Sequence, residues 1–88
     1  MKVLKCNPNR NDWIAVQVTR ENVNEVSLLC NADGYTIESE HDMVLFRINW
    51  HNHPVTFGDY FIRDIHWHWF SMSPEEFEHS FTCKEIDA

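Results

Sequence analysis

The stretch MVLFRINW, residues Met43–Trp50, decides how this chain folds. From Val44 onward an apolar residue stands at every second position, and the polar side chains of Arg47 and Asn49 fall between them. Successive side chains of a strand point to opposite sides, so a period of two is typical of a strand with one buried face. The stretch therefore predicts a strand whose buried face carries Val44, Phe46, Ile48 and Trp50.

The residues around this strand continue the β pattern. Runs rich in aromatic and β-branched residues alternate with clusters of Asn, Asp, Pro and Gly, which mark turns. We expect strands over residues 35–38, 55–63 and 67–72, a bend at Gly58, and turns over residues 40–42, 52–54 and 64–66. Nearer the start of the chain, residues 2–6 form a short apolar stretch, and Trp13–Val18 predicts a further strand.

One helix is expected before the central strands. Thr19 is a good N-cap residue, and apolar residues follow it at helical spacing as far as Cys30. Gly34 lies just beyond and can take the left-handed conformation that ends many helices.

A second helix is predicted near the end of the chain, where Ser73-Pro74-Glu75-Glu76 forms a specific start signal. Ser73 can cap the helix, proline suits the first helical position, and Glu76 completes a capping box. Phe77 and Phe81 are four residues apart and would present one apolar edge to the sheet.

These elements predict one domain over residues 1–88, because the chain is too short for two. The expected fold class is α+β: an antiparallel β-meander sheet with one helix before it and a short C-terminal helix. Sheet and helices would bury their apolar faces against one another.

The net charge of the chain limits the classes of partner that it can attract. The formal net charge is −7, and the few Lys and Arg residues are scattered. Nucleic acid and anionic membranes attract basic surfaces, so we expect neither as a direct partner. No apolar run reaches the length of a signal peptide core or a membrane span, which favours a cytoplasmic protein.

The chain offers no cofactor motif and no paired cysteine motif. It contains two glycines, too few for a loop that cradles phosphate, and we expect no bound cofactor. Cys6, Cys30 and Cys83 include no CxxC pair and are interpreted as buried apolar residues or free thiols of a reducing compartment. Cys6 and Cys83 could meet if the two ends of the chain pair.

Residues Phe57–Phe81 read FGDYFIRDIHWHWFSMSPEEFEHSF. This stretch resembles a pattern of short, mostly uncharacterised bacteriophage proteins, in which a Gly-Asp-aromatic-Ile strand, a hairpin and a Pro-x-x-Phe helix follow one another. The matching residues are Gly58, Asp59, Tyr60, Ile62, Arg63, Phe70, Pro74, Phe77 and Phe81. The resemblance implies a phage origin and the host cytoplasm as the location, and it transfers no catalytic residue.

The chain departs from that pattern at the hairpin. The phage proteins usually have glycine there, whereas this chain has Asp64 and then Trp67-His68. The departure directs attention to the candidate binding residues His66, Trp67, His68, Trp69 and Phe70. If they formed one strand, Trp67 and Trp69 would share one face and His66, His68 and Phe70 the other, so one set alone would be exposed.

Four histidines form two His-x-His pairs, His51/His53 and His66/His68. Each pair could offer two imidazoles to a metal ion from one face of a strand. All four would converge only in one long hairpin, and because residues 55–63 predict a strand of their own, we expect the pairs at its opposite ends. We therefore predict no metal site.

No nucleophile has a motif that would supply its base, so we expect that the protein is not an enzyme. The leading hypothesis is a small acidic phage-type accessory protein that binds and inhibits a host or bacterial defence protein. The contact would be the hairpin or the acidic C-terminal helix with Glu75 and Glu78. The alternative is a small-molecule (nucleotide) or metal-binding module that uses the same hairpin. The partner and the oligomeric state, a homo-oligomer included, are left open.

Overall fold

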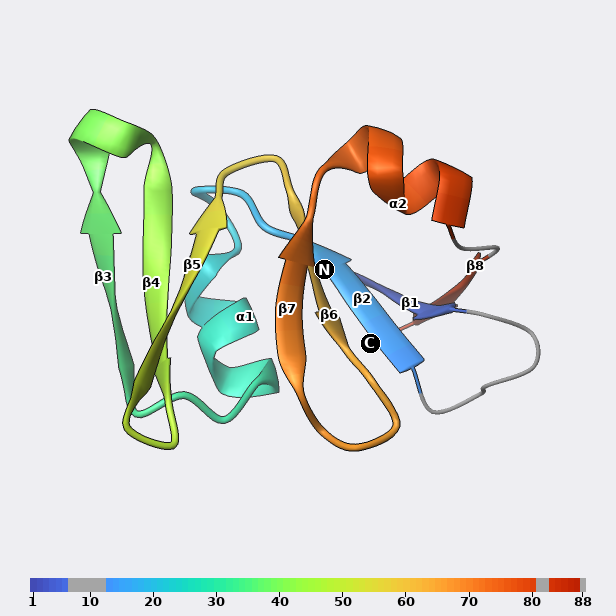
Figure 1. Ribbon diagram of the computed structural model, residues 1–88, viewed down its shortest axis with the longest axis horizontal. Coiled ribbons are helices and arrows are strands. Elements are labelled where there is room, and N and C mark those ends of the chain that lie inside the picture. Colours follow the sequence, from blue (N-terminus) through green and yellow to red (C-terminus); the bar gives the residue numbers. More distant parts are fainter. Residues whose placement is uncertain (7–12, 81–82, 88) are drawn as a thin grey trace.

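A computed structural model describes residues 1–6, 13–80 and 83–87, and these form two antiparallel sheets with two short helices (Figure 1). The larger sheet has the strand order β7-β6-β2-β1-β8. Its strands are β1 (Lys2–Cys6), β2 (Trp13–Gln17), β6 (Tyr60–Arg63), β7 (Trp69–Met72) and β8 (Cys83–Asp87). The smaller sheet has the order β3-β4-β5, from β3 (Gly34–Glu38), β4 (Met43–Ile48) and β5 (His51–Thr56).

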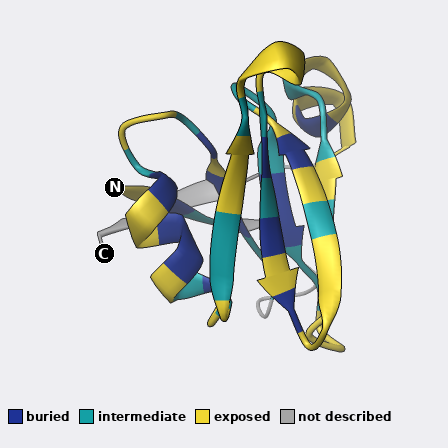
Figure 2. Ribbon diagram, turned by 90° about the vertical axis from the view of Figure 1, so that its left-hand side faces the viewer, coloured by how far each residue is buried: buried dark blue, intermediate teal, exposed yellow. Residues whose placement is uncertain are grey.

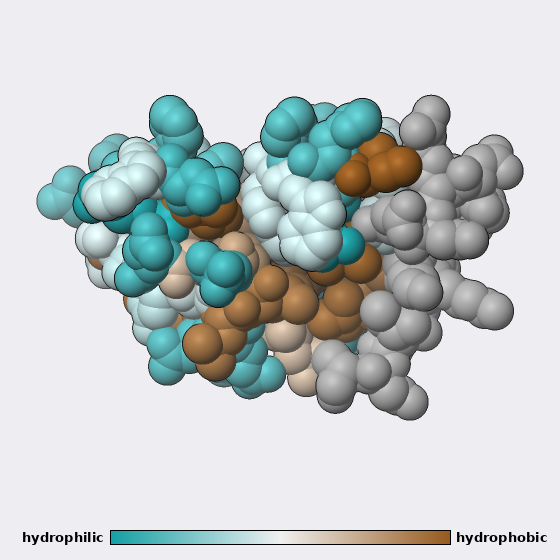
Figure 3. Space-filling view, turned by 90° about the horizontal axis from the view of Figure 1, so that it is seen from below, coloured by the Kyte–Doolittle hydropathy of each residue, from teal (hydrophilic) through white to brown (hydrophobic). Residues whose placement is uncertain are grey.

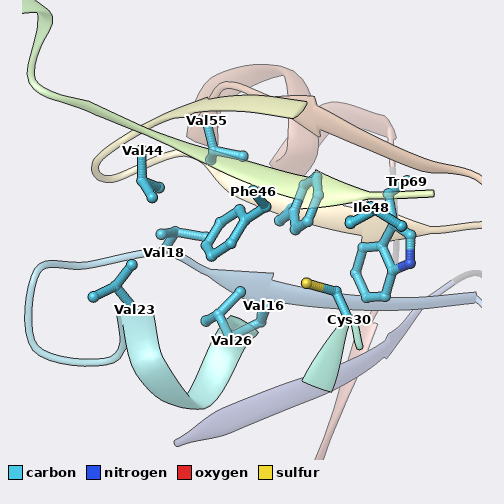
Figure 4. Close-up of a cluster of buried hydrophobic side chains, with 11 residues drawn as sticks. Val16, Val18, Val23, Val26, Cys30, Val44, Phe46, Ile48, Val55 and Trp69 are labelled. Carbon is cyan, nitrogen blue, oxygen red and sulfur yellow. The ribbon is translucent and has the colours of Figure 1, made fainter. Parts of the chain in front are cut away.

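The main core fills the space between the two sheets and helix α1 (Val23–Leu29). The larger sheet contributes Val16, Phe61 and Trp69 from one of its faces, and the smaller sheet contributes Phe46 and its neighbours (Figure 4). The Phe61 ring stacks on both Phe46 and Trp69, with centroids 5.3 and 4.7 Å apart. The exposed outer face of the smaller sheet is visible in Figure 2.

A second, smaller core lies on the other face of the larger sheet, beneath helix α2 (Pro74–Ser80). Phe77 is buried there against Ala15 and Ile62. Its ring stacks on Tyr60 at a centroid distance of 3.9 Å. The two faces of the larger sheet are therefore both covered, one by α1 and the smaller sheet and the other by α2.

The predicted α+β class is confirmed, and no helix falls within residues 43–62. The meander is divided between two sheets rather than continuous, because the predicted strand over residues 55–63 is interrupted at Phe57–Asp59. Gly58 has φ +98° and supplies the expected bend. The chain leaves one sheet at β5 and enters the other at β6.

The predicted turn over residues 52–54 is wrong, because these residues lie in β5. The hairpin turns instead at Asn49–Trp50, whose φ angles are 51° and 71°, and Ile48 pairs with His51. Positive φ at both central residues is the geometry of a type I′ turn. Trp50 therefore leaves the strand and does not share the buried face of Phe46.

The helix boundaries also differ in part from expectation. Asn22, not Thr19, is the N-cap residue of α1, and its Oδ1 accepts a hydrogen bond from the Thr19 N–H. Asn31, not Gly34, takes the left-handed conformation after α1. The capping role of Ser73 is confirmed, since its Oγ accepts the Glu76 N–H at 3.3 Å. Phe81 lies outside the described residues.

The two ends of the chain pair with each other, since β1 and β8 are neighbouring antiparallel strands. In this register the backbone positions of Cys6 and Cys83 lie opposite one another.

Candidate functional site

The β6–β7 loop is built around Asp64. Its Oδ1 accepts hydrogen bonds from the N–H groups of His66 and His68 at 2.8 and 2.9 Å. The Asp64 N–H in turn donates to the His68 carbonyl, and the Asp64 carbonyl accepts the Trp67 N–H. Donation by the His68 and His66 N–H groups holds the pKa of the Asp64 carboxyl below its ordinary value. One carboxylate thus closes a five-residue loop.

This closure presents Trp67 to solvent. Trp67 has φ 64°, in the left-handed region that side chains other than glycine adopt at a cost, and it is 71% exposed. The guanidinium carbon of Arg63 lies 3.9 Å from the centroid of its indole ring. That geometry is a cation–π contact, which orients the ring without burying it.

The β4–β5 turn repeats this arrangement with Trp50. Trp50 also has a positive φ, is 82% exposed, and lies beneath the guanidinium of Arg47 at 5.3 Å. Two hairpin tips thus each carry an exposed tryptophan at a backbone position suited to glycine, with an arginine from the preceding strand over the ring. Both tips lie at the same end of the molecule, the lower end in Figure 1.

Two adjoining cavities lie at this end. One has a volume of about 330 Å³ and is lined by Ile48, Asn49, His51, His53, Trp67, His68 and Trp69. The other, of about 160 Å³, shares four of these residues and reaches the end of α1 at Leu29, Cys30 and Asn31. Trp67 therefore stands between two hollows at the mouth of the main core. In Figure 3, which looks onto this end, pale and brown atoms interrupt the hydrophilic surface.

We call this region the tryptophan surface and define it by its exposed members Trp50, His51, Ile65, His66, Trp67 and His68. Its charged neighbours among the described residues include Arg47 and Arg63, while the Asp64 carboxylate is engaged by the loop. The region is thus richer in cationic and imidazole groups than the net charge of −7 would suggest.

The two histidine pairs come closer than expected, although not as a metal site. His51 and His53 share the inward face of β5, and both line the larger cavity together with His68. His66 and His68 belong to the loop, with ring centroids 6.2 Å apart. Within residues 1–6, 13–80 and 83–87, no group of three His, Cys, Asp or Glu side chains is placed to hold a metal ion.

The predicted alternation from Trp67 to Phe70 is wrong at Trp67, because strand β7 begins only at Trp69. Trp69 is 9% exposed and belongs to the main core. Phe70 points to the other face, where its ring meets Trp13 edge-on at 5.9 Å. Of the five candidate residues in this stretch, His66, Trp67 and His68 are exposed, whereas Trp69 and Phe70 support the fold.

Glu75 and Glu78 are exposed on α2, at the upper end of Figure 1, away from the tryptophan surface. A third glutamate of this helix, Glu76, lies near Asp59. Burial, with a smaller contribution from Glu76, raises the pKa of the Asp59 carboxyl. The exposed glutamates of α2 and the tryptophan surface therefore lie at opposite ends of the molecule, so the structure separates the two surfaces that the sequence proposed for binding.

Comparison with known protein families, curated proteins and solved structures found no match to this chain. Among the described residues, no helix has the length and apolar character needed to cross a membrane.

Sequence reasoning missed Trp50 and Arg47 as members of the site. Trp50 was assigned to the buried face of a strand because it continues the alternation of Phe46 and Ile48. The available signal was Asn49, since asparagine readily opens a type I′ turn. Glycine usually follows asparagine in such a turn, and because Trp50 stands there instead, the sequence does not indicate a turn.

Proposed function

We propose that this protein is a binding protein that docks on a partner protein through the tryptophan surface. The observation that carries the proposal is the pair of exposed tryptophans at positive φ. Folding gains little from either ring, because both are mostly in water, and the backbone at each would be relaxed by glycine. Local strain that the fold does not need is typical of functional positions.

The surface has the composition of a protein-binding site. Tryptophan and arginine are the residues most enriched at binding hot spots, and here Trp67 and Trp50 each lie under an arginine. A complementary partner would offer an apolar side chain to the hollow beside Trp67 and a carboxylate to Arg47. The resemblance to short phage proteins makes a host or bacterial defence protein the first class to test, with inhibition as the consequence of docking.

The experiment is capture from a bacterial host lysate on the immobilised chain, followed by mass spectrometry and by affinity measurement with the captured protein. Trp67→Gly is the decisive variant, because glycine suits φ 64° and removes the ring without disturbing the loop. We expect it to weaken binding by about 2 kcal/mol or more, which is roughly thirtyfold. Thr56→Ala removes an exposed side chain from the end of β5 that is far from His51, and should leave the affinity unchanged.

The acidic helix provides the opposing test. If α2 were the contact, Glu75→Lys with Glu78→Lys would slow association and reduce its salt dependence, because peripheral charges act mainly on the encounter rate. We expect these substitutions to have little effect. Wild-type affinity in a folded Trp67→Gly protein, together with a loss in the Glu75/Glu78 variant, would move the site to α2.

A second candidate function rests on the two adjoining cavities. A flat small molecule, such as a nucleobase, could stack on Trp67 beside His51, His53 and His68 in the hollow of about 330 Å³. Such a ligand would raise the melting temperature in a metabolite and nucleotide screen, because any ligand selective for the native state does so. The shift should disappear in Trp67→Gly, whereas no shift with any compound would leave the protein partner as the proposal.

A further inference from the structure

We propose that β3 is a self-association edge, and that two copies of this chain pair through it, antiparallel and centred on Thr36. The inference is independent of the tryptophan surface. It depends on which backbone groups of β3 are already bonded, on the side chains that a second copy would bring opposite, and on the lack of protection at this edge.

The hydrogen-bond pattern of the smaller sheet identifies the open groups. Phe57 N–H donates to the Asp42 carbonyl at 2.9 Å, and Ile48 closes the two-residue turn against His51. Even-numbered residues of β4 therefore bond to β5, and the odd-numbered ones bond to β3. The carbonyl of Arg47 accordingly accepts the Asp33 N–H from the β3 side.

In the register of β3 with β4, Thr36 lies opposite Leu45, and the backbone N–H and C=O groups of Thr36 bond to those of Leu45. Tyr35 and Ile37 consequently direct their N–H and C=O groups away from the sheet. β3 stands at the end of the strand order, and no bond within the described part of the chain uses these four groups. Four unpaired backbone groups along an extended edge form a template for another strand.

A second copy of β3 matches that template. When two β3 strands run antiparallel about Thr36, Tyr35 of each faces Ile37 of the other, and the four outward groups of one copy meet the four of the other. The side-chain pairs are then aromatic with β-branched, and Thr36 with Thr36, both of which stabilise antiparallel sheets. Glu38 falls opposite Gly34, so no like charges oppose each other.

The edge strand β3 also lacks the residues that usually prevent an edge strand from pairing with another chain. β3 contains no proline and no lysine, and its centre is open, with Thr36 exposed and Ile37 39% exposed. The opposite edge of the same sheet, β5, is different. Pro54 lies opposite Leu45, so its missing N–H falls on the free side of β5 and interrupts that template. Of the two edges of the smaller sheet, β3 is the one suited to a partner strand.

The paired segment is five residues long in each copy, so the interface is small and the dimer should be weak and concentration-dependent. Amide hydrogen exchange of the wild-type protein provides the first test. We expect the Tyr35 and Ile37 amides to become protected as concentration rises, while the Thr36 amide is protected at every concentration. Equal exchange of Tyr35 and Ile37 in dilute and concentrated samples would overturn the proposal.

Charge exchange provides the second test, in sedimentation velocity. Thr36→Lys and Thr36→Glu each place like charges directly opposite across the two-fold axis, and we expect each to weaken self-association about tenfold or more. An equimolar mixture of the two should recover it as a mixed pair. Thr56→Lys, the same change on the exposed outer face of β5, should leave self-association unchanged. Recovery that fails in the mixture, with both variants folded, would contradict the Thr36-centred register.

Discussion

The interior of the main core and its open end use aromatic residues in opposite ways. In the interior, Phe61 stacks on both Phe46 and Trp69, and all three rings are almost without exposure, so their burial explains their presence. At the open end, Trp50 and Trp67 are mostly in water and occupy backbone positions that suit glycine. Only His68 separates Trp67 from Trp69 in the sequence. The contrast teaches that aromatic content in a small domain divides into a part that folding requires and a part that it does not.

The largest expected effect is in the interior. Phe61→Ala removes a fully buried ring between Phe46 and Trp69, and should lower the free energy of unfolding by about 3–5 kcal/mol. A domain of this size has a total stability of about 5–10 kcal/mol, so much of it would be lost. Denaturant unfolding followed by circular dichroism measures the change. Trp67→Gly, measured alongside, should cost little, and a loss comparable to that of Phe61→Ala would erase the contrast.

The next effect is the opening of the β6–β7 loop. Asp64→Ala frees the His66 and His68 N–H groups, so we expect their amides to exchange rapidly and the Trp67 ring to lose its fixed orientation. His68→Ala retains the backbone N–H and should leave the loop closed. Amide exchange by nuclear magnetic resonance distinguishes the two variants.

The same loop should depend on pH in a defined direction. The folded pKa of Asp64 is lowered, so its contribution to stability is complete above the ordinary carboxyl value and is lost as the pH falls through the folded pKa. We therefore expect the loop to stay closed at the ordinary carboxyl pKa and to open only at a more acidic pH. An exchange profile of the His66 amide that shows no acid transition beyond the intrinsic rate would contradict this cause.

A smaller effect, of opposite sign, is expected at the β4–β5 turn. Trp50→Gly creates Asn-Gly, the preferred type I′ pair, and removes the cost of a left-handed tryptophan. We expect the free energy of unfolding to rise by about 0.5–1 kcal/mol, after the entropy cost of glycine is subtracted. Thermal unfolding measures it. A destabilised variant would show that the Trp50 ring contributes to the fold after all.

The smallest effect is at Asp59, near α2. Its folded pKa is raised, by burial first and by Glu76 second, so the ionised carboxylate costs stability at neutral pH. Asp59→Asn should therefore raise the melting temperature slightly at neutral pH, and the gain should vanish below the ordinary carboxyl value. A gain that persists in acid would assign the effect to packing instead of charge.

An element of the fold could be predicted from the sequence when local residues determine it, and could not when contacts between distant segments determine it. The prediction of helix α2 was correct because its start signal at Ser73 and Pro74 is local. The prediction of strand β4 was correct because its alternation of apolar and polar residues is strong. Strand β5 was missed because His51, Asn52 and Pro54 have weak strand preferences, and its place depends on pairing with β4. The bend at Gly58 was expected, but the division into two sheets depends on which distant strands pair, and no local pattern encodes that pairing.

The candidate site was predicted only in part, because some of its features depend on contacts that the local sequence does not reveal. His66, Trp67 and His68 lie where the sequence directed attention, but the separation of Trp67 from Trp69 arises from hydrogen bonds to Asp64 that a strand pattern does not reveal. Trp50 is distant in sequence and joins the site through the fold.

The neighbouring placement of one exposed and one buried indole also gives the protein its own optical reporters. Trp69, stacked in the core, should emit at shorter wavelength and resist iodide, whereas Trp50 and Trp67 should emit at longer wavelength and be quenched readily. The cation over each exposed ring should draw iodide closer and make it more effective than neutral acrylamide. Any occupant of the tryptophan surface would therefore report its own arrival through a blue shift and a loss of iodide access, without a label.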